Sequence, residues 1–197
     1  MSTIWNIWLS GGWVMIPLFG LAVLLYAQAF QLVMYVRRTN LRSDSEPYWF
    51  AWVREPEKAE GRVKEIIEYT QDGASVGAIS SDQVRNRFDE IRLALVSLIE
   101  RRTVFVSTLV AAAPLMGLLG TVLGMLQTFF GISTSGGTET AGVVAAGISE
   151  ALVTTQTGLT IALPGLFIVM IIQRQRQQLE ARILRLESLT LSHLKLD

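Results

Sequence analysis

The residues best suited to chemistry form a polar cluster inside a long apolar stretch of the chain. Glu150 is followed by Thr154 and Thr157, which fall at i+4 and i+7 and therefore share one face of a helix. Thr155 and Gln156 make other faces of the same helix polar. A carboxylate in an apolar setting usually faces a protein interior or a water-filled path, and hydroxyls can replace part of the hydration of a cation. The pattern favours a polar seam that moves a small cation.

Two plainer interpretations of Glu150 stay open at this point. The apolar helix could begin later, which would leave Glu150 at the membrane surface, or the group could be a neutral carboxyl with a structural hydrogen bond. No Lys or Arg occurs in residues 103–173 to pair with it, so the group needs another partner, water or a proton. The threonines are weaker evidence, because a threonine hydroxyl can bond to the carbonyl one turn back.

Other kinds of chemistry find no support in the sequence. The 197 residues include no Cys and one His, His193, which excludes disulfides, thiolate zinc sites and multi-histidine metal sites. There is no nucleophile–base pair, and the glycines of residues 117–124 lie in an apolar run that follows no strand, unlike those of a nucleotide fingerprint. The formal net charge is zero, whereas nucleic acid binding needs a basic face. We expect no enzyme, no metal, no cofactor and no nucleic acid partner.

The distribution of charge predicts a membrane protein. Half of the residues are hydrophobic, no charged side chain occurs in residues 1–36, and only Glu139 and Glu150 are charged in residues 103–173. A membrane span needs about 20 mostly apolar residues. We predict an all-α integral membrane protein with three transmembrane helices at 13–36, 104–130 and 141–172 and a short polar turn at 131–140.

Basic residues set the predicted orientation. All 17 Lys and Arg lie in residues 37–102 or 174–195, and basic residues favour the cytoplasmic side. The N-terminal segment 1–12 is therefore expected outside, with the loop 37–103 and the tail 173–197 in the cytoplasm. An outer aromatic belt of Trp5, Trp8 and Trp13 fits this orientation.

The cytoplasmic regions have helical periodicity. Apolar residues of the loop recur at helical spacing at Val84, Phe88, Ile91, Leu95 and Leu98. No helix-stopping signal follows residue 82, so this helix is expected to run unbroken into the second span. The tail repeats apolar residues at Leu179, Ile183 and Leu186. We therefore expect the second and third spans to extend as helices into the cytoplasm.

Small residues mark helix contacts in the last two spans. Gly117, Gly120 and Gly124 lie in the second span and Gly158 in the third. Helices in lipid associate where small residues let their backbones approach closely. The contact could lie within one chain, between copies of the chain, or both. Pro164 removes a backbone donor from the third span, which makes this helix easy to bend.

Two stretches of the last two spans carry distinctive motifs. They are residues 111–133 (AAAPLMGLLGTVLGMLQTFFGIS) and residues 147–166 (GISEALVTTQTGLTIALPGL). In this order they resemble the second and third transmembrane signatures of the ExbB/TolQ/MotA proton-channel family, and of the ExbB-type biopolymer transport subunits most of all. The order of the motifs and the three-span layout agree with the family.

The resemblance implies a pore-forming subunit of a motor in the bacterial inner membrane. It implies a homopentamer in lipid whose pore holds two copies of a single-span ExbD/TolR-like partner with a membrane aspartate. Proton flow, or sodium flow, would drive work on a periplasmic or outer-membrane client, as in TonB-dependent transport with a TonB-like protein. By the same resemblance the pore threonines fall on Thr121 and Thr155, the glutamate on Glu150 and the bending proline on Pro164.

Two features depart from a simple match. Helical spacing puts Thr155 about 140° around the helix from Glu150, whereas Thr154 and Thr157 share the face of Glu150. Many family members also carry an acidic–basic pair at the inner end of span one, where this chain has Gln28 and Gln31. The alternatives are a structural or assembly membrane protein without ion conduction and a flagellar-stator-like subunit, although stators usually have four spans.

Overall fold

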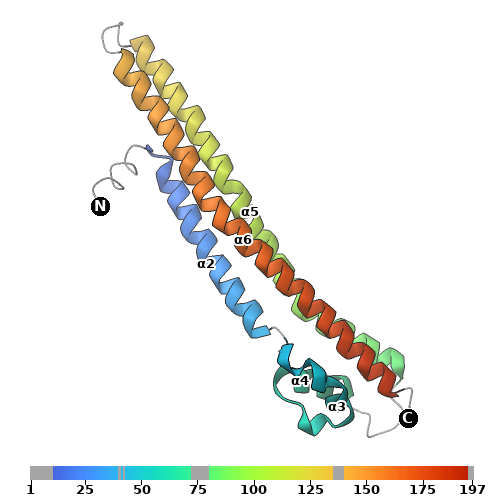
Figure 1. Ribbon diagram of the computed structural model, residues 1–197. Coiled ribbons are helices and arrows are strands. Elements are labelled where there is room, and N and C mark those ends of the chain that lie inside the picture. The colour runs from blue at the N-terminus through green and yellow to red at the C-terminus, as the bar shows by residue number, and fades with distance from the viewer. Residues whose placement is uncertain (1–10, 40, 42, 72–79, 135–139, 195–197) are drawn as a thin grey trace. The chain divides into compact units, whose positions relative to one another are not determined.

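The computed structural model describes residues 11–39, 41, 43–71, 80–134 and 140–194 of the chain. Every regular element in these ranges is helical (Figure 1). In chain order the elements are α2 (Met15–Thr39), η1 (Ser43–Tyr48), α3 (Trp49–Arg54), η2 (Pro56–Lys58), α4 (Gly61–Gln71), α5 (Ser81–Thr134) and α6 (Thr140–Leu194).

Within the described ranges, three helices are long and apolar enough to cross a membrane, as the sequence predicts. Helix α2 has 25 residues, α5 has 54 and α6 has 55. The expectation that one helix runs unbroken from residue 82 into the second span is confirmed by α5. Helix α6 likewise joins the third span and the tail in one helix. The exact membrane boundaries and the orientation stay predictions.

Several expectations fall on residues outside the described ranges. These are most of the outer segment 1–12, with Trp5 and Trp8, and the centre of the turn 131–140, with Glu139. Trp13 is described, and its side chain is exposed.

Helix α2 begins where local chemistry allows it. Gly12 precedes it with a φ of +66°, in the left-handed region that glycine adopts without steric cost. Pro17 is the third helical residue, where the missing amide would have had no partner within the helix. Arg37 and Arg38 occupy the last turn, where the negative end of the helix dipole favours cations.

Helices α5 and α6 each contain an internal proline. Pro114 lies within α5 and Pro164 within α6, and each helix continues through its proline. A proline has no N–H for the carbonyl four residues earlier. The carbonyls of Val110 and Thr160 therefore lose their usual helical donors.

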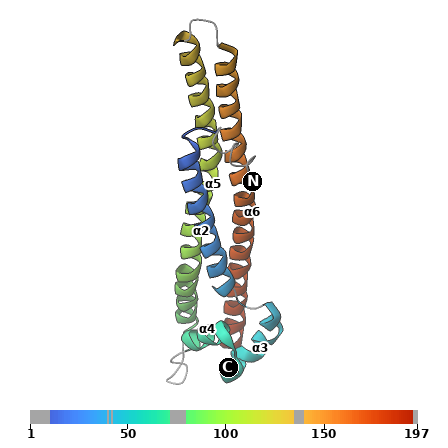
Figure 2. The same ribbon diagram turned by 90° about the vertical axis from the view of Figure 1, so that its left-hand side faces the viewer.

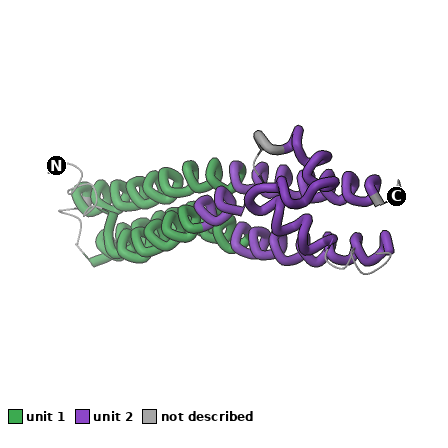
Figure 3. The backbone as a smooth tube through the Cα atoms, turned by 90° about the horizontal axis from the view of Figure 1, so that it is seen from below, with its two compact units in different colours: residues 1–31, 104–170 green, residues 32–103, 171–197 purple. Residues whose placement is uncertain are grey.

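The chain divides into two compact units (Figure 3), one of residues 1–31 and 104–170 and the other of residues 32–103 and 171–197. In the first unit the helices α2, α5 and α6 pack together (Figure 2). A methyl group added at Gly165 of α6 would lie 2.7 Å from Val110 of α5 and 3.5 Å from Leu25 of α2. This glycine therefore lies where all three helices meet.

The second unit has its own apolar core. Trp49 of α3, Ile67 of α4 and Phe88 of α5 are fully buried. The predicted tail face is confirmed, because Leu179, Ile183 and Leu186 are all buried.

The predicted face of the loop helix is only partly correct. Val84 and Phe88 are buried and Ile91 and Leu95 are half-buried, but Leu98 is 36% exposed. The buried stripe shifts around α5 to Val96, Ile99 and Thr103. A straight helix drifts relative to a seven-residue repeat, so a stripe followed in one register leaves the core after a few turns.

Candidate functional site

Glu150 lies against the segment that precedes α2. Its side chain is half-buried, and one carboxylate oxygen contacts Gly12. A methyl group at Gly12 would lie 2.6 Å from the Glu150 carboxyl carbon. The carboxylate thus sits at the N-terminal end of a 25-residue helix, where the helix dipole favours negative charge.

Thr154 is placed inside the contact between α5 and α6. The residue is fully buried, and a methyl group at Gly120 of α5 would lie 2.5 Å from the Thr154 Cβ. Its hydroxyl donates to the carbonyl oxygens of Glu150 at 3.1 Å and Ala151 at 2.9 Å. The predicted shared face with Glu150 therefore does not put Thr154 on an outward surface of the single chain.

Thr155 bridges the two helices. Its hydroxyl donates to the carbonyl oxygen of Gly117 in α5 at 3.3 Å, and the residue is half-buried. Gly117 packs on the same stretch, because a methyl group there would lie 3.1 Å from the Thr155 Cα. Both threonines thus contact α5. Thr154 packs against Gly120, whereas Thr155 donates a hydrogen bond to Gly117.

The other two predicted threonines bond within their own helices. Thr121 donates to the carbonyl of Leu118 at 2.6 Å, and Thr157 donates to the carbonyl of Val153 at 2.8 Å. Both residues are half-buried. Such bonds leave the lone pairs of each hydroxyl available to an ion or a water molecule.

The predicted glycines pack within the chain. A methyl group at Gly158 would lie 2.6 Å from the Ala113 carbonyl oxygen, and one at Gly124 would lie 2.9 Å from the Gly147 carbonyl oxygen. Gly117 and Gly120 face Gly158 and Thr154 respectively. The contact within one chain, which the sequence left open, is therefore present between α5 and α6.

A second polar surface of α6 points outward. Ser149, Gln156 and Thr160 lie at i, i+7 and i+11, so they share one helix face. All three residues are exposed in the single chain. Sequence analysis grouped the polar residues around Glu150 and did not identify this stripe, although its spacing is visible in the sequence.

Tyr26 is another residue that the sequence analysis missed. Its hydroxyl lies in the apolar helix α2 and donates to the carbonyl of Ile161 in α6 at 3.0 Å. Ile161 directly follows Thr160, whose carbonyl is the one that loses its helical donor to Pro164. The tyrosine therefore links α2 to α6 beside the interrupted part of the helix. A tyrosine in the middle of an apolar span was the available signal.

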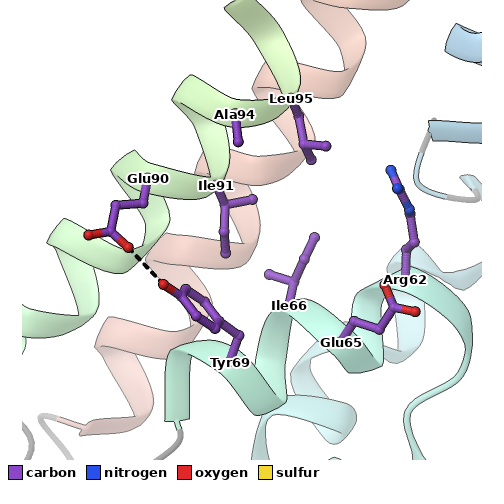
Figure 4. Close-up of a pocket in the computed structure, with 8 residues that line it drawn as sticks. All are labelled: Arg62, Glu65, Ile66, Tyr69, Glu90, Ile91, Ala94 and Leu95. Atoms are coloured by element: carbon purple, nitrogen blue, oxygen red, sulfur yellow. Dashed lines mark hydrogen bonds between the residues drawn. The ribbon is translucent and has the colours of Figure 1, made fainter. Parts of the chain in front are cut away.

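The pocket between α4 and α5 involves none of the predicted site residues (Figure 4). Its volume is about 360 Å³. It has an apolar floor and charged residues at its edge, and it is lined by Arg62, Glu65, Ile66, Tyr69, Glu90, Ile91, Ala94 and Leu95. Among the described residues there is no group of His, Asp or Glu that could hold a metal ion.

Comparison with known proteins yields a family match that covers all of α5 and most of α6. Residues 60–184 match the MotA/TolQ/ExbB proton channel family. The chain is 30% identical over 187 residues to the biopolymer transport protein ExbB-like 1 of Synechocystis sp., which covers 87% of this chain and 72% of that protein. It is 44% identical over 71 residues to the biopolymer transport protein ExbB of Salmonella typhimurium, which covers 36% of this chain and 29% of the relative.

Proposed function

Because the chain belongs to the MotA/TolQ/ExbB proton channel family, we propose that it is the pore-forming subunit of an ion-driven motor in the bacterial inner membrane. Five copies surround two copies of a single-span ExbD/TolR-like partner. Proton flow through the assembly drives work on a periplasmic or outer-membrane client through a TonB-like protein. The N-terminus lies outside and the loop and tail lie in the cytoplasm, as the distribution of basic residues favours.

The outward polar face of α6 carries this proposal. Ser149, Gln156 and Thr160 are exposed on a helix that is apolar enough to cross a membrane. Thr160 donates within α6 to the Gln156 carbonyl at 2.8 Å, but lipid offers no hydrogen bonds to the Gln156 amide, and such groups normally face protein or a water-filled cavity. A ring of copies would turn this face toward a shared interior and leave apolar faces toward lipid.

Glu150 supplies the fixed charge of the proposed ion path. Residues 103–173 contain no Lys or Arg to neutralise it, so its charge is available to a cation. The hydroxyls of Thr121, Thr155 and Thr157 replace part of the hydration of that cation. Thr154, which is buried against Gly120, holds α5 and α6 together beside the path. The expected ion is the proton, and no cofactor takes part.

Assembly is tested by purifying the full chain with its single-span partner. We expect native mass spectrometry of the detergent-solubilised complex to show five copies of this chain and two of the partner. A dimer or trimer that retains no partner would contradict the motor and favour a structural protein.

Ion movement is tested by reconstituting the same complex into liposomes that carry a pH-sensitive dye. Glu150→Gln keeps the size of the side chain and removes its charge, so we expect proton flux to fall at least tenfold, about 1.4 kcal/mol of lost interaction. Glu57→Gln, an exposed acid in η2, is the matched control and leaves flux unchanged. Flux that follows a sodium gradient instead would replace the proton by sodium.

A further inference from the structure

Gly12 combines two constraints that only glycine satisfies. Its φ of +66° is a conformation that residues with a side chain rarely adopt. Its open side is filled by Glu150, since a methyl group there would collide with the carboxylate oxygen and lie 3.3 Å from the Glu150 Cγ. The residue is 138 positions from Glu150 in the sequence, so this contact is made by the fold alone.

Gly61 shows that the two constraints are separable. It is the first residue of α4 and has a φ of +63°, nearly the same conformation, but a methyl group there would meet nothing within 4 Å. A glycine with a positive φ in this chain therefore does not have to contact a carboxylate. The contact at Gly12 is a property of the place where α2 meets α6.

The N-terminal end of α2 lies next to the contact, and the positive end of the helix dipole favours a negative charge there. The Met15, Ile16 and Leu18 amides are already bonded and Pro17 has no amide N–H, so this attraction comes from the helix as a whole and not from free N–H groups of the first turn. The turn itself is held by bonds from the Met15 amide to the Gly12 carbonyl and from the Ile16 amide to the Trp13 carbonyl, both at 3.2 Å.

We propose that Gly12 is a positioning residue for Glu150. By lacking a side chain in a left-handed turn, it lets the carboxylate rest at the N-terminal end of α2, so that the first span fixes where the ionisable group of the third span lies. The role of that carboxylate in ion movement rests on the proposed function, whereas the contact itself does not.

The contact is tested by carbodiimide labelling of Glu150 in the full complex, quantified by mass spectrometry. Gly12→Ala displaces the carboxylate from the turn and exposes it to the reagent, so we expect the labelling rate to rise severalfold. Gly61→Ala imposes the same backbone strain elsewhere. Gly11→Ala crowds Met15 and Val153 beside the site. Both controls leave the labelling rate of Glu150 unchanged. Equal rates in wild type and Gly12→Ala would overturn the proposal.

A shorter acid at position 150 tests whether Gly12→Ala acts through the position of the Glu150 carboxylate or through general damage to the fold. Aspartate at position 150 is one methylene shorter, so it withdraws the carboxylate oxygen that a methyl group at Gly12 would strike first. We therefore expect Gly12→Ala to reduce proton flux severalfold in the wild-type background and much less in the Glu150→Asp background. An equal loss in both backgrounds would show that Gly12 does not act through Glu150. If even the wild-type complex conducts no protons, the proposed function fails, while the labelling result still decides the contact.

Discussion

Gly117 of α5 and Gly158 of α6 lie in backbone contact. A methyl group on Gly158 would lie 3.2 Å from the Gly117 Cα and 2.6 Å from the Ala113 carbonyl oxygen. The atoms in the way belong to the main chain, which cannot rotate aside as a side chain can. The two helices can therefore approach this closely only while both positions lack a side chain.

Gly158→Ala is expected to destabilise the α5–α6 pair by about 1–3 kcal/mol, the usual cost of overpacking a tight contact. The measurement is thermal unfolding of the detergent-solubilised complex. Gly142→Ala, in the same helix, is the matched control because a methyl group there meets nothing within 4 Å. Since alanine is the better helix former, Gly142→Ala should be neutral or slightly stabilising. Equal losses from both variants would show that helix propensity, not the contact, matters.

The long helices could be predicted because their signals are local. Charge-free runs of sufficient length and the spacing of apolar residues indicate three apolar helices and the continuity of α5. Small residues at Gly117 and Gly158 indicate a helix contact. The membrane boundaries along each helix do not have such a local signal, because helical hydrogen bonding continues beyond the lipid without a break.

The partners of the site residues could not be predicted, because they depend on contacts far apart in the chain. Helical spacing grouped Thr154 with Glu150, but the close approach of Gly120 buries Thr154 between α5 and α6. The contact of Glu150 with Gly12 joins residues 138 positions apart, and neither composition nor periodicity indicates such a pair. One face of one helix can be read from its sequence, whereas what covers that face depends on the other helices.

Tyr26→Phe is expected to destabilise the first unit by about 1 kcal/mol, since it removes the hydrogen bond to the Ile161 carbonyl and keeps the ring. The effect should appear as a lower thermal unfolding midpoint. Tyr48→Phe is the control, because that ring stacks on Trp52 and lies exposed outside the spans. No difference between the two variants would mean that the Ile161 carbonyl finds another donor.

Glu46→Gln is expected to weaken the second unit by about 2 kcal/mol, the scale of hydrogen bonds to charged groups. The Glu46 carboxylate accepts bonds from Arg182 at 2.8 Å and Arg185 at 3.1 Å, and the Arg182 side chain is only 15% exposed. The amide keeps the shape and loses the charge. Thermal unfolding measures the loss, with exposed Glu57→Gln as control. A Glu46→Gln midpoint equal to that of the control would mean that the arginines pair equally well with water.

Tyr69 is expected to titrate above an ordinary tyrosine. Its phenol donates a hydrogen bond of 2.7 Å to the Glu90 carboxylate (Figure 4). That bond, together with the negative charge of Glu90, raises the pKa of Tyr69 above 10.0, because loss of the proton would leave two anions in contact. The raised pKa means that the bond contributes fully to stability below the pKa of an unfolded tyrosine. The contribution is lost as the pH rises through the folded-state value.

Tyrosinate absorbance, compared with a Tyr69→Phe variant, isolates the titration of Tyr69 among the four tyrosines. Glu90→Gln should lower the pH midpoint of the Tyr69 titration. Glu65→Gln removes the charge of another acid that lines the same pocket, and it should change that midpoint little. An unchanged midpoint in Glu90→Gln would rule out the bond as the cause.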